Sequence, residues 1–369
     1  MSAKSLILLT AGGTGGHVFP AEALAAELMN RGHRLAFVTD RRGAAYGGAL
    51  GGLDTYRISG GGIAGRSLIK RVSALGSLVV GYFQARSLIH RLRPAAVIGF
   101  GGYASVPAVM AANHLGVPSA VHEQNAVLGR ANRLLAGGAT RIATSFHHTG
   151  RVKPQWRKKV RRTGNPVRAS ILPLRDQAYP SLFGHGPISL LVVGGSQGAK
   201  VFSDLVPQAL IKLPHDLQRR LSVHQQCKAE DVERVGKLYH HHGIAADLRP
   251  FFDDIPARLA EAHLVIGRSG ASTVAELAAA GRPAIMVPYP HAIDDHQTAN
   301  AQAFAQGGAG WLTPQSTLTP DLLAKHIEDL LTHPEKLAEA AAAAHAESIP
   351  DAAERLADLV ADLAAGAVS

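Results

Sequence analysis

The sequence predicts an α/β protein with two domains, each built on a parallel β-sheet. Its 369 residues, 46% of them hydrophobic, are enough for two ordinary cores. Apolar strand-like runs alternate with helical stretches in the first half, which is the rhythm of a parallel sheet. The same rhythm restarts near residue 188, after a polar passage that contains prolines. Two Rossmann-like domains facing one cleft follow from this organisation.

In the first half, short apolar runs typical of buried strands precede stretches with helical periodicity. The expected elements are strand 6–10, helix 21–30, strand 35–39, helix 68–83, strand 95–100 and helix 106–115. Residues 94–122 contain no Asp, Glu, Lys or Arg, a length that raises the question of a membrane span. Prolines and the Gly101-Gly102 pair interrupt this segment, so a buried strand, a turn and a helix fit it better.

The second half opens with a near-continuous apolar run over 188–193, as expected of a strand buried on both faces. The later elements are helix 201–213, strands at Val223, 264–266 and 284–287, and helices after Asp321, of which Pro334 and Pro350 open two. The predicted domains are 1–163 and 164–345, and a last helix within 346–369 is expected to pack back on the first domain. The hinge is placed within 164–187.

The composition limits the compartment in which the protein works. Its single cysteine, Cys227, excludes an internal disulfide and a cysteine-based zinc site, which suits a reducing cytosol. The first apolar run, over 6–10, is too short for the core of a signal peptide. We therefore expect the protein to stay inside the cell.

Positive charge is concentrated in one part of the chain. Residues 55–175 hold 19 Lys and Arg against a single acid, Glu123, whereas the remainder has a net charge of −8. This asymmetry suggests an anionic partner, which leaves a nucleic acid, a membrane surface or a phosphorylated substrate open. The basic run 151–162 around Trp156 could hold phosphates or lipid headgroups, or could be a solvated loop.

The predicted helix over 68–83 has apolar residues at helical spacing and basic residues near both ends. This pattern would suit a contact with a membrane interface through Lys70, Arg71, Leu75, Val79 and Phe83. The alternative is an amphipathic helix whose apolar stripe faces the core of its own domain.

Four glycine turns lie where predicted strands end and helices begin. They are Gly12-Gly-Thr-Gly-Gly-His17, Gly101-Gly-Tyr-Ala-Ser105, Gly194-Gly-Ser-Gln-Gly198 and Gly267-Arg-Ser-Gly-Ala-Ser-Thr273. Backbone N–H groups at a helix N-terminus bind anions, and glycines let the anion approach closely. Each turn alone is a weak signal, and Thr273 with Glu276 could instead form a capping box. Together they predict a phosphate-rich ligand.

Two common nucleotide motifs do not fit these turns. Val18 stands where a dinucleotide fingerprint requires glycine. Ala199 and Val201 stand where a P-loop requires glycine and Ser or Thr. A dehydrogenase and a P-loop NTPase are therefore disfavoured.

The glycine turns belong to a longer ordered set of motifs. The others are His122-Glu-Gln-Asn125, Gly164-Asn-Pro-Val-Arg168, Arg268-Ser-Gly-Ala-Ser-Thr-Val-Ala-Glu276 and His296-Gln297. The whole set, which spans nearly the full chain, closely resembles the MurG family of bacterial glycosyltransferases. The resemblance implies a GT-B fold, with two Rossmann-like parallel-sheet domains facing a deep cleft.

The resemblance also implies an activity. Members of the family transfer N-acetylglucosamine, with inversion, from UDP-N-acetylglucosamine (UDP-GlcNAc) to the C4 hydroxyl of N-acetylmuramic acid in lipid I, giving lipid II for peptidoglycan. The resemblance implies no cofactor, since UDP-GlcNAc is a substrate. It also implies no strict requirement for a metal ion. The implied location is peripheral, on the cytoplasmic face of the inner membrane, whose anionic surface would meet the 68–83 helix. Other cell-wall synthesis proteins are candidate partners, and nucleic acid is not.

Site residues follow from the family motifs, position by position. UDP-GlcNAc contacts are implied for Thr14, Gly15, Gly16, Asn125, Arg168, Ser196, the backbone at Phe252, Ala271, Ser272, Thr273, Val274, Ala275, Glu276 and Gln297. Contacts with the acceptor and its pyrophosphate are implied for Gly12, Gly13, Gly101, Gly102 and Tyr103. The donor residues fall mainly in the C-terminal domain and the acceptor residues in the N-terminal one.

Transfer requires a base for the acceptor hydroxyl and stabilisation of the departing UDP. His17 is the candidate base, and its alternative role is to orient its turn or to bind the acceptor pyrophosphate. Glu123 is a weaker candidate for the base, and it could instead order its loop through a nearby arginine.

Two rival functions remain open. A UDP-GlcNAc 2-epimerase would use the same fold and nucleotide sugar without a lipid acceptor. A nucleic-acid-binding protein would explain the basic run, but aromatic residues make up only 5% of the chain and no recognition motif appears.

Overall fold

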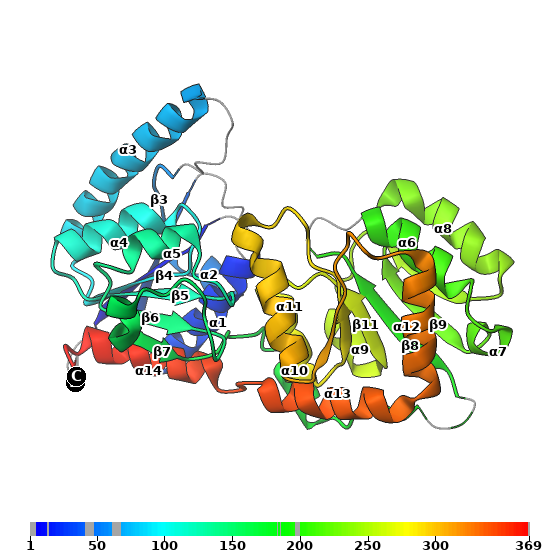
Figure 1. The fold of residues 1–369 in the computed structure, drawn as a ribbon. Helices are drawn as coiled ribbons and strands as arrows, with labels where there is room; N and C mark the ends of the chain where they lie inside the picture. The colour runs from blue at the N-terminus through cyan, green and yellow to red at the C-terminus, as the bar shows by residue number, and fades with distance from the viewer. Residues whose placement is uncertain are drawn as a thin grey trace. The chain divides into compact units, whose positions relative to one another are not determined.

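The computed structural model describes residues 5–12, 15–40, 48–60, 68–182, 184, 186–195 and 200–367; for Gly15 and residues 68–73 it describes the backbone alone. The chain forms two compact units (Figure 1). The N-terminal unit comprises Met1–Arg168 and Ile349–Ser369, and the C-terminal unit comprises Ala169–Ser348. The chain therefore crosses between the units twice, and the first crossing falls within the segment expected to be the hinge.

The N-terminal unit is built on a parallel sheet that has seven strands in the described residues, in the order β3-β2-β1-β4-β5-β6-β7. The strands are β1 (Leu6–Thr10), β2 (Arg34–Thr39), β3 (Asp54–Arg57), β4 (Ala96–Gly99), β5 (Ser119–Glu123), β6 (Arg141–Thr144) and β7 (Val160–Arg162). In the centre, Leu8 pairs with Ala36 on one side and Val97 on the other. The central strands β1 and β4 are apolar for most of their length because helices cover both faces of the sheet.

Helices pack on the two faces of this sheet as two separate layers. The helical elements are α1 (Gly15–Asn30), α2 (Gly48–Gly51), α3 (Leu68–Leu92), α4 (Ser105–His114), α5 (Arg130–Leu135), the 3-10 helix η1 (Pro154–Lys159) and α14 (Ala352–Ala364). One core joins α3, α4 and α5 to the sheet, and the other joins α1, α2 and α14. Figure 1 shows α14, in red, running along this unit, where Leu356, Val360 and Leu363 share a core with Ile7 and Leu9.

The C-terminal unit repeats the architecture with six parallel strands in its described residues, in the order β10-β9-β8-β11-β12-β13. The strands are β8 (Ile188–Val193), β9 (Leu221–Gln226), β10 (Ala245–Arg249), β11 (Leu264–Gly267), β12 (Ala284–Met286) and β13 (Gly310–Leu312). The helical elements are η2 (Leu172–Asp176), α6 (Lys200–Leu210), α7 (His215–Gln218), α8 (Ala229–His241), α9 (Ile255–Glu261), α10 (Ala271–Ala280), η3 (Ile293–Asp295), α11 (His296–Gln306), α12 (Pro320–Thr332) and α13 (Pro334–Glu347). The apolar run of β8 lies at the centre of the sheet, as its sequence predicts.

The apolar stripe of α3 does not face the core over its whole length. Leu75, Val79 and Phe83 are 60%, 50% and 62% exposed, while Ala74 and Leu88 on the other face are buried. The alternative in which this stripe faces the core of its own domain is therefore wrong for these three residues, because the helix turns its opposite face to α4. In the part of the chain that the structure describes, no helix is long and apolar enough to cross a membrane.

The basic run 151–162 is mostly folded, so the expectation of a loop is wrong, although most of its charged side chains are exposed to solvent as that interpretation required. It forms η1 and the edge strand β7, and Trp156 packs into the N-terminal core. Lys153 holds its ammonium 5.0 Å from the centre of the Trp156 ring. Lys159 donates to the carbonyls of Gly137 and Ala139, just beyond α5. Aromatic packing and backbone hydrogen bonds thus account for part of the run.

Candidate active site

Two of the predicted glycine turns meet at the carboxyl ends of β1 and β4, which are neighbours in the N-terminal sheet. The Ser105 hydroxyl joins them, with its Oγ 2.9 Å from the Thr10 carbonyl and 2.7 Å from the Gly101 carbonyl. A Cβ added to Gly12 would lie 2.5 Å from the Cβ of Ala104. The close approach of the two turns therefore requires glycine at this position.

His17 lies in the first turn of α1, against the second of these turns. A Cβ on Gly101 would lie 3.2 Å from His17 Cε1, and one on Gly102 would lie 2.8 Å from the carbonyl oxygen of Gly12. Both Gly101 and Gly102 have positive φ, +91° and +71°, which other residues rarely adopt. The structure thus brings the candidate base together with three predicted acceptor residues, and Tyr103 follows them directly.

A buried polar network lies behind His17. Gln124 places its Oε1 3.0 Å from His17 Nδ1, and its Nε2 lies 3.0 Å from both the Phe100 carbonyl and His122 Nδ1. His122 Nε2 in turn lies 3.0 Å from the carbonyl of Gly164. Burial lowers the pKa of His122 to about 4, so this imidazole is neutral at physiological pH.

Glu123 is buried and accepts four hydrogen bonds. One carboxylate oxygen accepts from the backbone N–H and the side-chain amide of Asn125, and the other accepts from the Gly129 N–H and the Asn132 amide. The donor distances lie between 2.8 and 3.1 Å. These contacts support the role of Glu123 in ordering its loop. Among the described residues, the groups that bond to its carboxylate are backbone and side-chain amides, not the arginine that the sequence suggested.

Arg168, at the first crossing, packs its guanidinium over Phe19 of α1, 5.2 Å from the ring centre. Gly164 precedes it with φ +87°, and a Cβ there would lie 2.8 Å from the Cβ of Ile349. The Gly164–Arg168 motif is therefore closely packed against the segment in which the chain returns to the N-terminal unit.

In the C-terminal unit, the predicted diphosphate site is the beginning of α10. Gly270 caps the helix with extended backbone, and the helix starts at Ala271. Thr273 is therefore the third helical residue, so the alternative in which it caps the helix with Glu276 is wrong. The first N–H groups of a helix have no intrahelical acceptor. The buried Ser272 hydroxyl likewise has no partner among the described residues.

Residues around this helix start are tied to α11. Ser269 donates its hydroxyl to the Gln297 carbonyl at 2.8 Å and accepts from the Asn300 amide at its own carbonyl at 3.0 Å. The Gln297 side chain accepts from the Tyr289 N–H through Oε1. Gln297, a predicted donor contact, is thus held beside the start of α10.

Gln226, at the end of β9, is a residue that the sequence did not single out. Its Oε1 accepts from the Gly194 N–H, and its Nε2 donates to the carbonyls of Gly195 and Pro250. It thereby joins the third glycine turn to the segment that leads to Phe252, whose ring lies 4.0 Å from the Arg258 guanidinium carbon. The sequence alone carries no signal for this residue, because its three partners are backbone groups of distant segments.

Several predicted residues lie where less can be said. Gly13, Thr14 and Ser196 are outside the described residues. Gly15, Lys70 and Arg71 are placed on α1 and α3 by their backbone alone. Gly16 follows in the first turn of α1, and Val274 and Ala275 follow in the first turns of α10.

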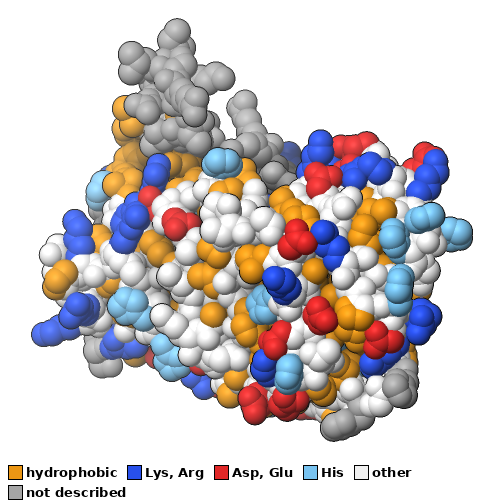
Figure 2. Space-filling view, turned by 45° about the vertical axis from the view of Figure 1, so that its right-hand side comes forward, with side chains coloured by type: hydrophobic (Ala, Val, Ile, Leu, Met, Phe, Trp, Pro, Cys, Tyr) orange, Lys and Arg blue, Asp and Glu red, His pale blue; other side chains and the backbone are white. Residues whose placement is uncertain are grey.

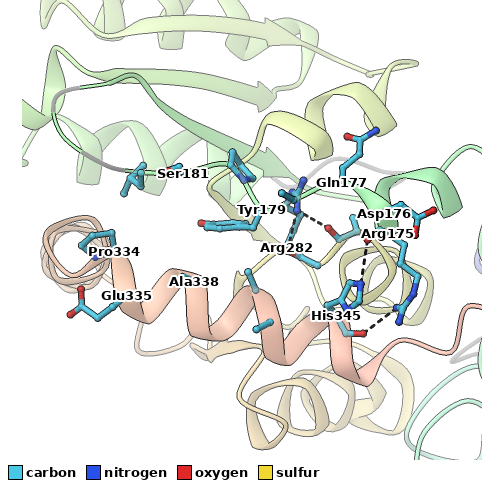
Figure 3. A pocket seen from close by; sticks show the side chains of 17 residues that line it. Arg175, Asp176, Gln177, Tyr179, Ser181, Arg282, Pro334, Glu335, Ala338 and His345 are labelled. Atoms are coloured by element: carbon cyan, nitrogen blue, oxygen red, sulfur yellow. Dashed lines mark hydrogen bonds between the residues drawn. The ribbon is translucent and has the colours of Figure 1, made fainter.

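A cavity of about 780 Å³ in the C-terminal unit lies elsewhere, and none of the predicted site residues lines it (Figure 3). It is bounded by residues 175–182, the end of α10 and α13. Arg282 donates there to the carbonyls of Leu259 and Ala280, where α9 and α10 finish. Burial lowers the pKa of this guanidinium. Figure 3 also shows His345 bonded to Arg175, so the visible contacts are structural.

Comparisons with known proteins agree with this geometry. Models described as the glycosyltransferase family 28 N-terminal and C-terminal domains match residues 7–144 and 189–356. A Paramagnetospirillum magneticum protein named UDP-N-acetylglucosamine-N-acetylmuramyl-(pentapeptide) pyrophosphoryl-undecaprenol N-acetylglucosamine transferase is 58% identical over 360 residues, covering 98% of this chain and 97% of its own. The crystal structure of Acinetobacter baumannii MurG has a TM-score of 0.77 at 33% identity, covering 97% and 99%. The chain belongs to the MurG family.

Membership of the MurG family settles the fold as GT-B, with two parallel-sheet α/β domains. The epimerase alternative shares this fold: the UDP-GlcNAc 2-epimerase of Neisseria meningitidis has a TM-score of 0.64, covering 96% of this chain and 98% of its own. Its sequence identity is only 11%, so that likeness concerns the fold alone. The Paramagnetospirillum magneticum relative, in contrast, matches in sequence over nearly the whole chain.

Proposed function

We propose that the chain transfers N-acetylglucosamine from UDP-GlcNAc to the C4 hydroxyl of N-acetylmuramic acid in lipid I, giving lipid II. The observation that carries the proposal is the 58% identity, over 98% of the chain, to a protein named as that transferase. The close packing of His17 against the Gly101-Gly102 turn supports it, because this arrangement sets a base beside a backbone able to receive a pyrophosphate.

The chemistry assigned to these residues is one displacement. The acceptor oxygen forms a bond to the anomeric carbon as the bond from that carbon to UDP breaks, and the bonding electrons leave with UDP. His17 takes the proton of the attacking hydroxyl. The displacement is direct, so no covalent intermediate with the enzyme is needed. Attack on the face opposite the leaving group inverts the anomeric centre.

The departing UDP gains negative charge on its diphosphate. In the proposed mechanism the start of α10 stabilises that charge, since its first N–H groups and the Ser272 hydroxyl are available as donors. Glu276, one turn further along, accepts hydrogen bonds from the ribose hydroxyls. These roles need no metal ion, which an assay with EDTA tests.

The decisive experiment follows labelled N-acetylglucosamine from UDP to a lipid I analogue, with wild type and His17→Ala, each with and without EDTA. We expect transfer that survives EDTA and falls by a factor of about 100 or more in the variant. Full activity of His17→Ala would show that His17 is not the base. Conversion of UDP-GlcNAc by folded wild type without transfer to lipid I would favour the epimerase.

We also propose that α3 binds the anionic surface of the inner membrane. Four large apolar side chains, Leu75, Val79, Val80 and Phe83, are at least half exposed on this helix. Hydrophobic side chains gather at the upper left in Figure 2, the region in which α3 lies in Figure 1. The backbone places Lys70 and Arg71 on the first turns of the same helix, where cations would meet lipid headgroups.

A further inference from the structure

The orientation of the Gln124 side chain is fixed by backbone carbonyls. One end of its amide lies 3.0 Å from the Phe100 oxygen and 3.1 Å from the His122 oxygen. Carbonyl oxygens only accept, so this end must be the NH₂ group. The opposite end, Oε1, therefore faces His17 Nδ1 at 3.0 Å. Reversing the amide would set its oxygen against two carbonyl oxygens.

The protonation of His122 is fixed in the same way. Its Nε2 lies 3.0 Å from the Gly164 carbonyl, so this nitrogen carries the proton. The ring is neutral at physiological pH because burial lowers its pKa to about 4. Its Nδ1 is therefore an acceptor, and it lies 3.0 Å from the NH₂ group of Gln124. Every direction in the network is thus determined by a group that can only accept.

The network ends on His17. Because Gln124 presents an oxygen to His17 Nδ1, that nitrogen must donate and hold the ring proton. In a neutral imidazole with its proton on Nδ1, the basic lone pair is on Nε2. We propose that Gln124, held by His122 and the Gly164 carbonyl, is a positioning residue that keeps His17 in the tautomer whose Nε2 accepts a proton.

The far end of the network is rigid. Gly164 has φ +87°, and a Cβ there would lie 2.8 Å from Ile349 Cβ and 2.9 Å from Ala352 Cβ. The Gly164 carbonyl, which accepts the hydrogen bond from His122, is thus held in place because Gly164 packs against the segment that leads into α14. His122 itself packs its ring 5.5 Å from that of Phe100. The tautomer of His17 is therefore set by buried groups at the ends of β4 and β5 and in the Gly164 turn.

The catalytic meaning of this arrangement rests on the proposed function, in which His17 takes the proton of the acceptor hydroxyl. The tautomer itself does not depend on that function. Nitrogen NMR of the full chain labelled with ¹⁵N-histidine measures it directly, and His17→Ala identifies the His17 signals among the 19 histidines. In wild type above pH 7.5 we expect a protonated Nδ1 and an unprotonated Nε2.

Gln124→Met removes the oxygen that holds the His17 proton while keeping a side chain of similar length. We expect the His17 proton to redistribute to Nε2 and kcat to fall about tenfold or more, with KM for UDP-GlcNAc unchanged. The matched control is Gln225→Met, which removes a buried amide bonded to Phe202 and Tyr239 in the C-terminal unit. It should alter neither the His17 signals nor kcat.

Two results would overturn the proposal. One is a wild-type His17 with its proton on Nε2, a measurement that requires no variant to fold. The other is a Gln124→Met protein with unchanged His17 signals and unchanged kcat. Wild-type kcat in His17→Ala, with the expected tautomer in the wild type, would instead refute the proposed base and leave the tautomer assignment standing.

Discussion

Glu123 combines deep burial with four hydrogen bonds to its carboxylate, all from amide groups. A glutamine there keeps the shape but replaces one accepting oxygen by a donor. We expect Glu123→Gln to lower the stability of the N-terminal unit by about 2 to 4 kcal/mol, because buried donors lose their acceptor. Urea unfolding followed by Trp156 fluorescence, in a Trp311→Phe background, measures this. A loss of kcat beyond 100-fold at native stability would instead identify Glu123 as the base.

His122 should make the N-terminal unit sensitive to acid. Its pKa is about 4 in the folded protein against 6.5 for an ordinary histidine, so the unfolded chain binds more protons between these values. Stability falls as the pH drops through 6.5, and the loss levels off near 4. From pH 7.5 to 5 we expect a loss of about 2 kcal/mol from this residue. The same Trp156 measurement on His122→Gln should show that much less dependence on pH, and an equal dependence would contradict the assignment.

At the scale of single residues, the sequence predicts which residues belong to the site better than it predicts how their side chains are oriented. His17 follows from its glycine turn, and the structure places it against the Gly101-Gly102 turn. The role of Gln124 could not be predicted, because it depends on carbonyls of Phe100 and Gly164 that are distant in sequence. Side-chain hydrogen bonds to remote backbone leave no periodic signal.

Among the helices, α10 carries a prediction about the donor. Glu276→Ala should raise KM for UDP-GlcNAc about tenfold, since hydrogen bonds to a charged group contribute about 1.5 to 3 kcal/mol. Steady-state kinetics with varied UDP-GlcNAc at saturating acceptor measures it. Glu339→Ala, an exposed glutamate on α13, is the matched control and should leave KM unchanged. An unchanged KM in Glu276→Ala would exclude it from the nucleotide site.

The helix α3 carries a prediction about the membrane. Reversing both charges in Lys70→Glu with Arg71→Glu should weaken binding to anionic vesicles about tenfold or more, at about 1 kcal/mol for each basic residue near the surface. Activity on a soluble acceptor analogue should stay close to wild type. Vesicle co-sedimentation measures the binding, and Arg219→Glu with Lys237→Glu, in the C-terminal unit, is the matched control. Equal vesicle binding by the α3 variant would refute the proposed contact.

Elements were predictable where their apolar pattern is complete. Strands β1 and β8 lie in the centres of their sheets, so they read as continuous apolar runs. The edge strands β3 and β10 are largely exposed and contain Asp and Arg, which leaves them no such pattern. Periodicity identifies the apolar stripe of α3 without identifying what covers it, so the sequence left a membrane contact and a core-facing stripe both open.

At the scale of the whole molecule, each unit has its own core and its own tryptophan. Trp156 lies in the N-terminal unit and Trp311 in the C-terminal unit, and the chain has only these two. Leu356→Ala on α14 should lower the stability reported by Trp156 by about 3 kcal/mol and leave the Trp311 transition in place. Leu330→Ala on α12, equally buried, should do the reverse. Identical shifts at both tryptophans would show that the units unfold as one.

The position of α14 has a consequence for the order in which the protein is made. A ribosome synthesises the strands of the N-terminal sheet first, then the C-terminal unit, and only afterwards the helix α14, which shares a core with Ile7 and Leu9. The N-terminal unit is therefore begun first but completed last. The C-terminal unit can fold while the N-terminal unit still lacks α14 and exposes the apolar surface that this helix packs against. We therefore expect chaperones to bind a nascent chain stalled before Ile349 through the apolar surface of its N-terminal unit, which still lacks α14.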